Sequence, residues 1–171
     1  MALRVRKAAQ TPTGQLSNAA LIDLSLRNYL SLNALSSGYG VAMHLGTIVR
    51  TMFASFYLFD AGFGVTHPSI YSDADMWLGE LAISRNLESG YRLGPHAVQA
   101  TARLLELYDS QLRTAPLDEL VEAHQRAQAN FQAPPERRMS MAALVQRCPP
   151  GLHEVSLDSI VTCKATRTDM F

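Results

Sequence analysis

The chain has 171 residues, which is long enough for one domain with a sizeable core. Its fifteen basic residues balance fifteen acidic ones, so no net charge attracts it to nucleic acid or to an anionic membrane. Only 18% of the residues are charged, against roughly 25% in an average soluble domain. We therefore expect a partner to cover part of the apolar surface, and a homodimer is the simplest such arrangement.

The N-terminal part is expected to begin with a flexible arm and to continue into a helix. Residues 1–15 are basic and then rich in Thr, Pro, Gly and Gln, which is typical of a mobile segment. Ser17 is a good N-cap for a first helix, which leucines and alanines at helical spacing extend to Leu35. Gly38 and Gly40 then favour a turn.

A second helix is predicted from about Val41 to Asp60. It is apolar nearly all round, which is typical of a helix surrounded by others. Because it carries His44 and Arg50, and a charge near the centre of a spanning helix costs about 2.5–3.5 kcal/mol, the pattern favours a buried central helix over a membrane span. Gly62 is suited to a left-handed cap at its C-terminal end.

The second half of the chain contains signals for further helices. A third helix is expected to start near Ser72 or Asp73, either of which can cap it, and to stop at Gly90. Prolines favour the first helical position, which predicts two more helix starts. The fourth, fifth and sixth helices are expected to begin at Pro95, Pro116 and Met139.

These elements predict an all-α fold, a single compact bundle of about five to six helices around the central apolar helix. The helical domain is expected to cover residues 16–147. Residues 148–171 change in character and predict a C-terminal arm that is extended or disordered, because a single strand without a partner is not stable.

No motif indicates catalysis, a metal or a cofactor. The five histidines are spread along the chain without a close pair, whereas zinc sites need several converging ligands. The sequence contains neither a Gly-x-Ser-x-Gly turn nor a complete glycine-rich phosphate loop. Cys148 and Cys163 are interpreted as reduced thiols, and we expect a cytoplasmic, non-enzymatic protein without an export signal.

His44 and Arg50 are expected to be buried polar groups on the central helix. Buried polar groups need partners, so Arg50 is expected to pair with a carboxylate from a neighbouring helix. An anion pocket beneath the glycine-rich ends of this helix is the functional alternative. The candidate carboxylates are Asp23, Asp60, Asp73, Asp75 and Glu80.

A helix-turn-helix-like segment around residues 80–103 indicates an alternative function in DNA binding. It has a helix, a turn containing Gly90 and a second helix, although the turn is longer than usual and the chain is neutral overall. The polar residues that would face DNA are Arg85, Arg92, His96, Gln99 and Arg103.

Aromatic residues of the central helix give the main functional hypothesis. Phe56, Phe59 and Phe63 share one side, and if that side is exposed it is a natural dimer or partner interface. The sequence thus predicts a non-enzymatic, bacterial-type regulatory, inhibitory or accessory protein that acts by protein–protein binding, with a homodimer as its expected state. The alternatives are a DNA-binding transcriptional regulator and a small-molecule sensor with an apolar pocket beside the central helix.

Overall fold

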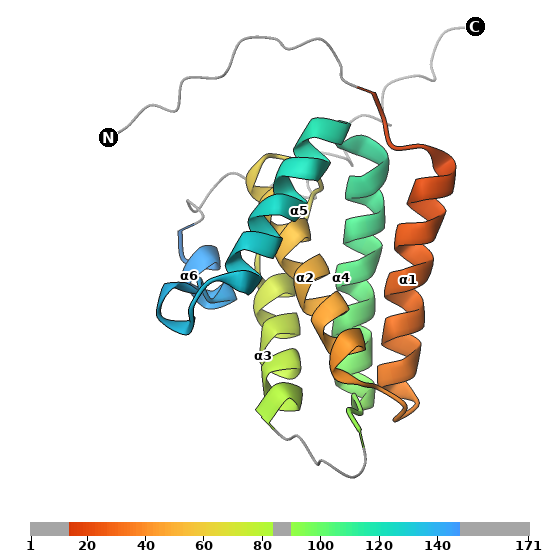
Figure 1. The fold of residues 1–171 in the computed structure, drawn as a ribbon, viewed down its shortest axis with the longest axis vertical. Coiled ribbons are helices and arrows are strands. Elements are labelled where there is room, and N and C mark those ends of the chain that lie inside the picture. Colours follow the sequence, from red (N-terminus) through yellow and green to blue (C-terminus); the bar gives the residue numbers. More distant parts are fainter. Residues whose placement is uncertain (1–13, 84–89, 148–171) are drawn as a thin grey trace, which may run out of the picture.

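The computed structural model describes residues 14–83 and 90–147, which form six α-helices and one 3₁₀ turn (Figure 1). Within these ranges the structure contains no β-strand, and Gly40 and Tyr91 form an isolated antiparallel bridge. The predicted all-α bundle is therefore confirmed. Its elements are α1 Asn18–Ser36, α2 Ala42–Asp60, α3 Ser69–Ile83, α4 Pro95–Thr114, α5 Leu117–Gln132, η1 Pro135–Arg137 and α6 Met141–Val145.

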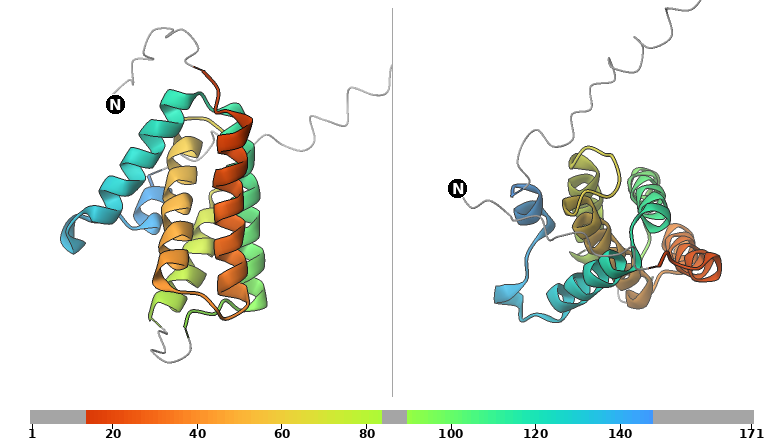
Figure 2. Two further views of the ribbon diagram at one scale, coloured as in Figure 1. Left: turned by 45° about the vertical axis from the view of Figure 1, so that its right-hand side comes forward. Right: turned by 90° about the horizontal axis from the view of Figure 1, so that it is seen from above.

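The first four helices run alternately down and up the bundle, and α2 lies at its centre (Figures 1 and 2). Helices α1, α3, α4 and α5 all contact α2, and α1 also packs against α4. The segment Ala54–Phe59 of α2 is buried without interruption, which fits a helix covered on all sides. Helix α5 leads to α6, which packs against α3.

Local signals account for several helix ends. Ser17 caps α1 by accepting a hydrogen bond from the Ala20 amide at 3.3 Å. Gly62, with a φ of 96°, follows the end of α2, and Pro95 is the first residue of α4. These predicted boundaries are confirmed. They could be predicted because each depends on residues next to the boundary.

The start of α3 differs from the prediction. The helix begins at Ser69, upstream of Ser72 and Asp73, and the His67 Nδ1 accepts a hydrogen bond from the Ser69 amide at 3.2 Å. This early start brings Tyr71 into the helix, where its side chain is fully buried. Helix α3 is described to Ile83, so the predicted extension toward Gly90 falls in residues 84–89, outside the described ranges.

The other helix boundaries shift slightly. Pro116 is the N-cap of α5 and not its first residue, and α6 is shorter than predicted. The predicted C-terminal arm with both cysteines lies outside the described residues, as does the N-terminal arm up to residue 13. Within residues 14–83 and 90–147, no helix combines the length and the hydropathy that a membrane crossing requires.

Candidate functional site

The aromatic side of α2 is covered by the chain itself. Phe56 and Phe59 are 2% and 1% exposed, and the ring of Tyr71 from α3 packs against both, at centroid distances of 5.3 and 5.6 Å. Phe63 is partly buried against the same core. The predicted partner interface at Phe56 and Phe59 is therefore wrong, because α3 occupies the side on which a partner would have to bind.

A buried polar cluster joins α2, α3 and α4 beside these rings. The Ser55 hydroxyl donates to Gln111 Oε1 at 2.7 Å, and the Tyr71 hydroxyl donates to the Ser55 carbonyl at 3.1 Å. Gln111 Nε2 donates to the carbonyls of Ser55 and Phe63, both at 3.0 Å. We call Ser55, Tyr71 and Gln111 the Ser–Tyr–Gln cluster. Its members form hydrogen bonds with one another and with backbone carbonyls, so we interpret the cluster as a structural link between the three helices.

The expectation that His44 and Arg50 are buried is also wrong. Both side chains are only partly covered. His44 Nδ1 accepts a hydrogen bond from the Val41 amide at 3.1 Å, so this imidazole caps the start of α2. Arg50 lies 5.5 Å from the centre of the Phe131 ring on α5. An aromatic face replaces the predicted carboxylate, since α5 runs beside α2 and presents that ring to the guanidinium.

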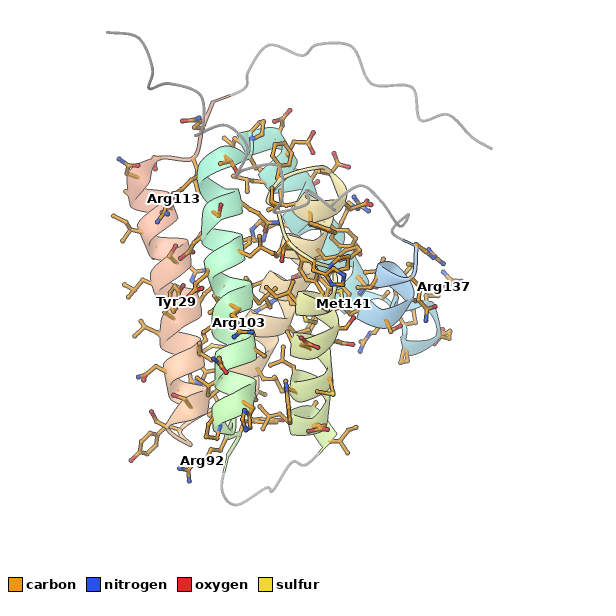
Figure 3. All side chains as sticks on the ribbon, turned by 180° about the vertical axis from the view of Figure 1, so that it is seen from behind. Tyr29, Arg92, Arg103, Arg113, Arg137 and Met141 are labelled. Atoms are coloured by element: carbon orange, nitrogen blue, oxygen red, sulfur yellow. The ribbon has the colours of Figure 1, made fainter. Side chains whose placement is uncertain are left out.

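The residues of the DNA-binding alternative are not arranged as in a helix-turn-helix. Helices α3 and α4 lie side by side (Figures 1 and 3), whereas the helices of that motif cross at about 90–120°. Arg92 and Arg103 are exposed but lie far apart along the direction of α4 (Figure 3). His96 and Gln99 are also exposed on α4, and Arg85 lies outside the described residues.

Tyr108 and His124 form a hydrogen-bonded pair between α4 and α5 that the sequence did not reveal. The Tyr108 hydroxyl and His124 Nε2 are 2.6 Å apart. Burial raises the pKa of Tyr108 and lowers the pKa of His124. Tyr108 is 1% exposed and His124 is partly buried, so we interpret the pair as a link between the two helices.

The surface has open hollows that bear on the sensor alternative. One, of about 640 Å³, lies beyond the C-terminal end of α2, where Phe63, Ile70 and Leu107 supply apolar walls and Arg103 lines the rim. A second hollow, of about 270 Å³, lies between Trp77 of α3 and the start of α4. No group of three histidines, cysteines or carboxylates suited to a metal ion occurs among the residues that the structure describes.

Helix α1 has an unusual distribution of polar and apolar side chains. Its inner side carries polar groups: Asn28 Oδ1 accepts a hydrogen bond from Thr51 of α2 at 3.0 Å, and Ser25 donates to Asp109 of α4 at 2.7 Å. Leu35 packs in the core beside them. This inner side is fully engaged by α2 and α4, which hold the helix at the edge of the bundle (Figure 2).

The opposite side of α1 exposes large apolar residues. Ile22, Leu26 and Leu30 are 62%, 55% and 58% exposed, and they follow one another at four-residue spacing. Tyr29 lies beside them on the edge toward α4 (Figure 3), where burial and the nearby Asp109 raise its pKa. We call Ile22, Leu26, Tyr29 and Leu30 the outer face of α1.

Two opposite charges lie along the other edge of this outer face. Arg27 and Asp23 form an ion pair at 2.8 Å, one helical turn apart, and both side chains are largely exposed. Ala19 and Asn33, also exposed, continue the outer face so that Ala19, Ile22, Leu26, Tyr29 and Asn33 repeat at alternating three- and four-residue steps. This spacing is that of a seam between paired helices.

A comparison with models of known protein families finds no match, and no curated protein or solved structure is significantly similar to the chain. The site must therefore be judged by its chemistry and geometry.

Proposed function

We propose that this protein is a non-enzymatic regulatory, inhibitory or accessory protein that acts by binding another protein chain through the outer face of α1. The single observation that carries the proposal is the exposed row Ile22, Leu26 and Leu30 on a helix whose inner side is already packed. Contiguous exposed apolar side chains rimmed by polar groups mark interaction surfaces in soluble proteins.

Among residues 14–83 and 90–147, the row Ile22, Leu26 and Leu30 is not part of the packed core. The Ser–Tyr–Gln cluster and the Tyr108–His124 pair each connect helices, so their chemistry is explained by folding. In contrast, Leu26 and its neighbours on the outer face contribute little to the core while being held on a rigid helix of 19 residues. At 1.5 Å per residue the seam from Ala19 to Asn33 is about 21 Å long.

The chemistry of the rim favours a protein partner over a lipid surface. Helices that bind membranes in their plane carry a polar side rich in Lys and Arg. Here Arg27 is paired with Asp23 at one edge, and both acidic and basic side chains of α4 lie near Tyr29 at the other. An apolar centre with a mixed polar rim is the pattern of protein interfaces.

Photo-crosslinking in cells that naturally make the protein tests this proposal. A photoreactive residue is placed at Leu26 and, as a matched control, at Asp73, which is exposed on α3. Helix α3 lies away from α1 in the bundle (Figure 2). We expect crosslinked protein products, of any identity, from position 26 and not from position 73. If position 26 gives no protein product, the outer face is not a binding surface and the proposal is overturned.

A further inference from the structure

We infer that the chain on the outer face of α1 is a second copy of this protein, with the two α1 helices antiparallel about a two-fold axis at Leu26. This inference rests on the proposed function and names the partner for the same surface. Two properties of α1 carry it: the symmetry of its apolar row and the order of the charges at its edge.

The apolar row is symmetric about Leu26. In an antiparallel pair related by a two-fold axis, a residue a given number of positions before the axis faces the residue the same number after it in the other copy. Ile22 and Leu30 each lie four positions from Leu26, and both are exposed. Each Ile22 therefore faces Leu30 of the second copy, and the two Leu26 side chains meet at the axis.

The charged edge is complementary to itself in the same arrangement. A two-fold axis perpendicular to the helices keeps the edge carrying Asp23 and Arg27 beside the same edge of the other copy. With a rise of 1.5 Å per residue, Arg27 of one copy lies about 3 Å along the helix direction from Asp23 of the other. A long arginine side chain spans that offset. Each Arg27 therefore meets Asp23 of the second copy, which gives two equivalent contacts between opposite charges.

A parallel pair lacks this match. Its two-fold axis runs along the helices and places the Asp23–Arg27 edge beside the opposite edge of the other copy, which carries Ile22 and Tyr29. The Asp23–Arg27 pair would then face Ile22 and the Tyr29 ring and would meet no opposite charge of the second α1. Charge order therefore favours the antiparallel arrangement.

One helix on each side gives a modest contact. Standard stable interfaces bury about 800 Å² per partner, more than a seam of this length offers by itself. We therefore expect a reversible dimer that dissociates in the micromolar range, and its apparent mass should rise with concentration.

Disulfide trapping tests the geometry in the full-length chain. The two natural cysteines are replaced (Cys148→Ser, Cys163→Ser) and one cysteine is introduced at a time. Leu26→Cys should give a disulfide-linked dimer under mild oxidation, because the two positions meet at the axis. Asn33→Cys is the matched control, since in the antiparallel pair its two copies lie about 21 Å apart, beyond the reach of about 7 Å of a disulfide.

Each outcome of the trapping decides the inference. Efficient linkage at position 26 without linkage at 33 supports it, whereas linkage at both positions indicates a parallel pair and overturns it. A lack of linkage at 26, in a chain that stays monomeric by sedimentation equilibrium up to high micromolar concentration, also overturns it. The proposed function survives that result if photo-crosslinking at Leu26 still captures a different protein, so the two failures are distinguishable.

Charge exchange provides an independent measurement. Asp23→Arg and Arg27→Asp should each raise the dissociation constant of the dimer at least several-fold, because like charges then meet across the axis. The double variant restores complementarity and should return the constant toward that of the unchanged chain. Circular dichroism verifies that each variant keeps its helix content. If the double variant is as weak as the single ones, the self-complementary edge is wrong.

Discussion

Helices α1 and α2 have the same length of 19 residues but use their apolar residues in opposite ways. Helix α2 carries the aromatic row that resembles an interface, and the neighbouring helices bury it. Helix α1 is less apolar, yet it exposes Ile22, Leu26 and Leu30. The difference lies in position, because among the described helices α2 is surrounded and α1 has neighbours on one side only. Exposure, and not apolar composition alone, therefore marks a candidate interface.

The largest expected effect tests whether the buried aromatic row of α2 contributes more to the free energy of unfolding than the exposed row of α1. Phe59→Ala should lower the free energy of unfolding by about 3–5 kcal/mol, because it leaves a cavity in the core. The matched change Leu26→Ala, measured by urea unfolding at a concentration where the chain is monomeric, should alter it by less than about 0.5 kcal/mol. Equal losses from both changes would show that the outer face of α1 belongs to the core.

The Ser–Tyr–Gln cluster should give the next largest effect. Gln111→Ala removes the side-chain donor to the Phe63 carbonyl and the acceptor for the Ser55 hydroxyl. Leaving buried polar groups without partners should cost about 1–3 kcal/mol in unfolding free energy. Gln99→Ala, at an exposed position of the same helix, is the control. A similar loss from both variants would contradict the structural role of the cluster.

The Tyr108–His124 pair predicts a smaller, pH-dependent effect. Because burial lowers the pKa of His124 in the folded state, the unfolded chain binds its proton first as the pH falls. The contribution of the neutral imidazole is thus present above about pH 6.5 and is lost as the pH drops toward the lowered pKa. Urea unfolding across this range should show that loss in the unchanged chain and in His96→Gln, but not in His124→Gln.

The smallest expected effect concerns the edge of the outer face. Arg27→Ala removes an exposed ion pair one turn apart, which should change the unfolding free energy of the monomer by only about 0.3–0.5 kcal/mol. High salt should remove most of that difference. A change of several kcal/mol, measured by urea unfolding at low protein concentration, would mean that this edge supports the fold of the single chain.

Features set by neighbouring residues could be predicted from the sequence. The central helix, the Ser17 cap, the Gly62 turn and the Pro95 start all depend on local conformational preferences. The start of α3 was missed because an imidazole, His67, acts as the cap and replaces the usual hydroxyl or carboxylate.

Which side of a helix faces inward could not be predicted. Helix α1 has leucines on both sides, so its pattern indicates two apolar faces without saying which one the bundle covers. Its inner side also holds Asn28, whose hydrogen bond to Thr51 exists only once α2 is in place. Likewise, the contact between Arg50 and the Phe131 ring depends on the position of α5, which no local sequence signal encodes.

The symmetric arrangement of the proposed dimer would limit how far an assembly can grow. When a surface is its own complement across a two-fold axis, one bound copy occupies it completely and leaves no equivalent surface for a third. A head-to-tail surface of the same hydrophobicity would instead extend into open filaments. In the proposed dimer, the position of Leu26 midway between Ile22 and Leu30 would thus let a protein with an exposed apolar helix associate without polymerising.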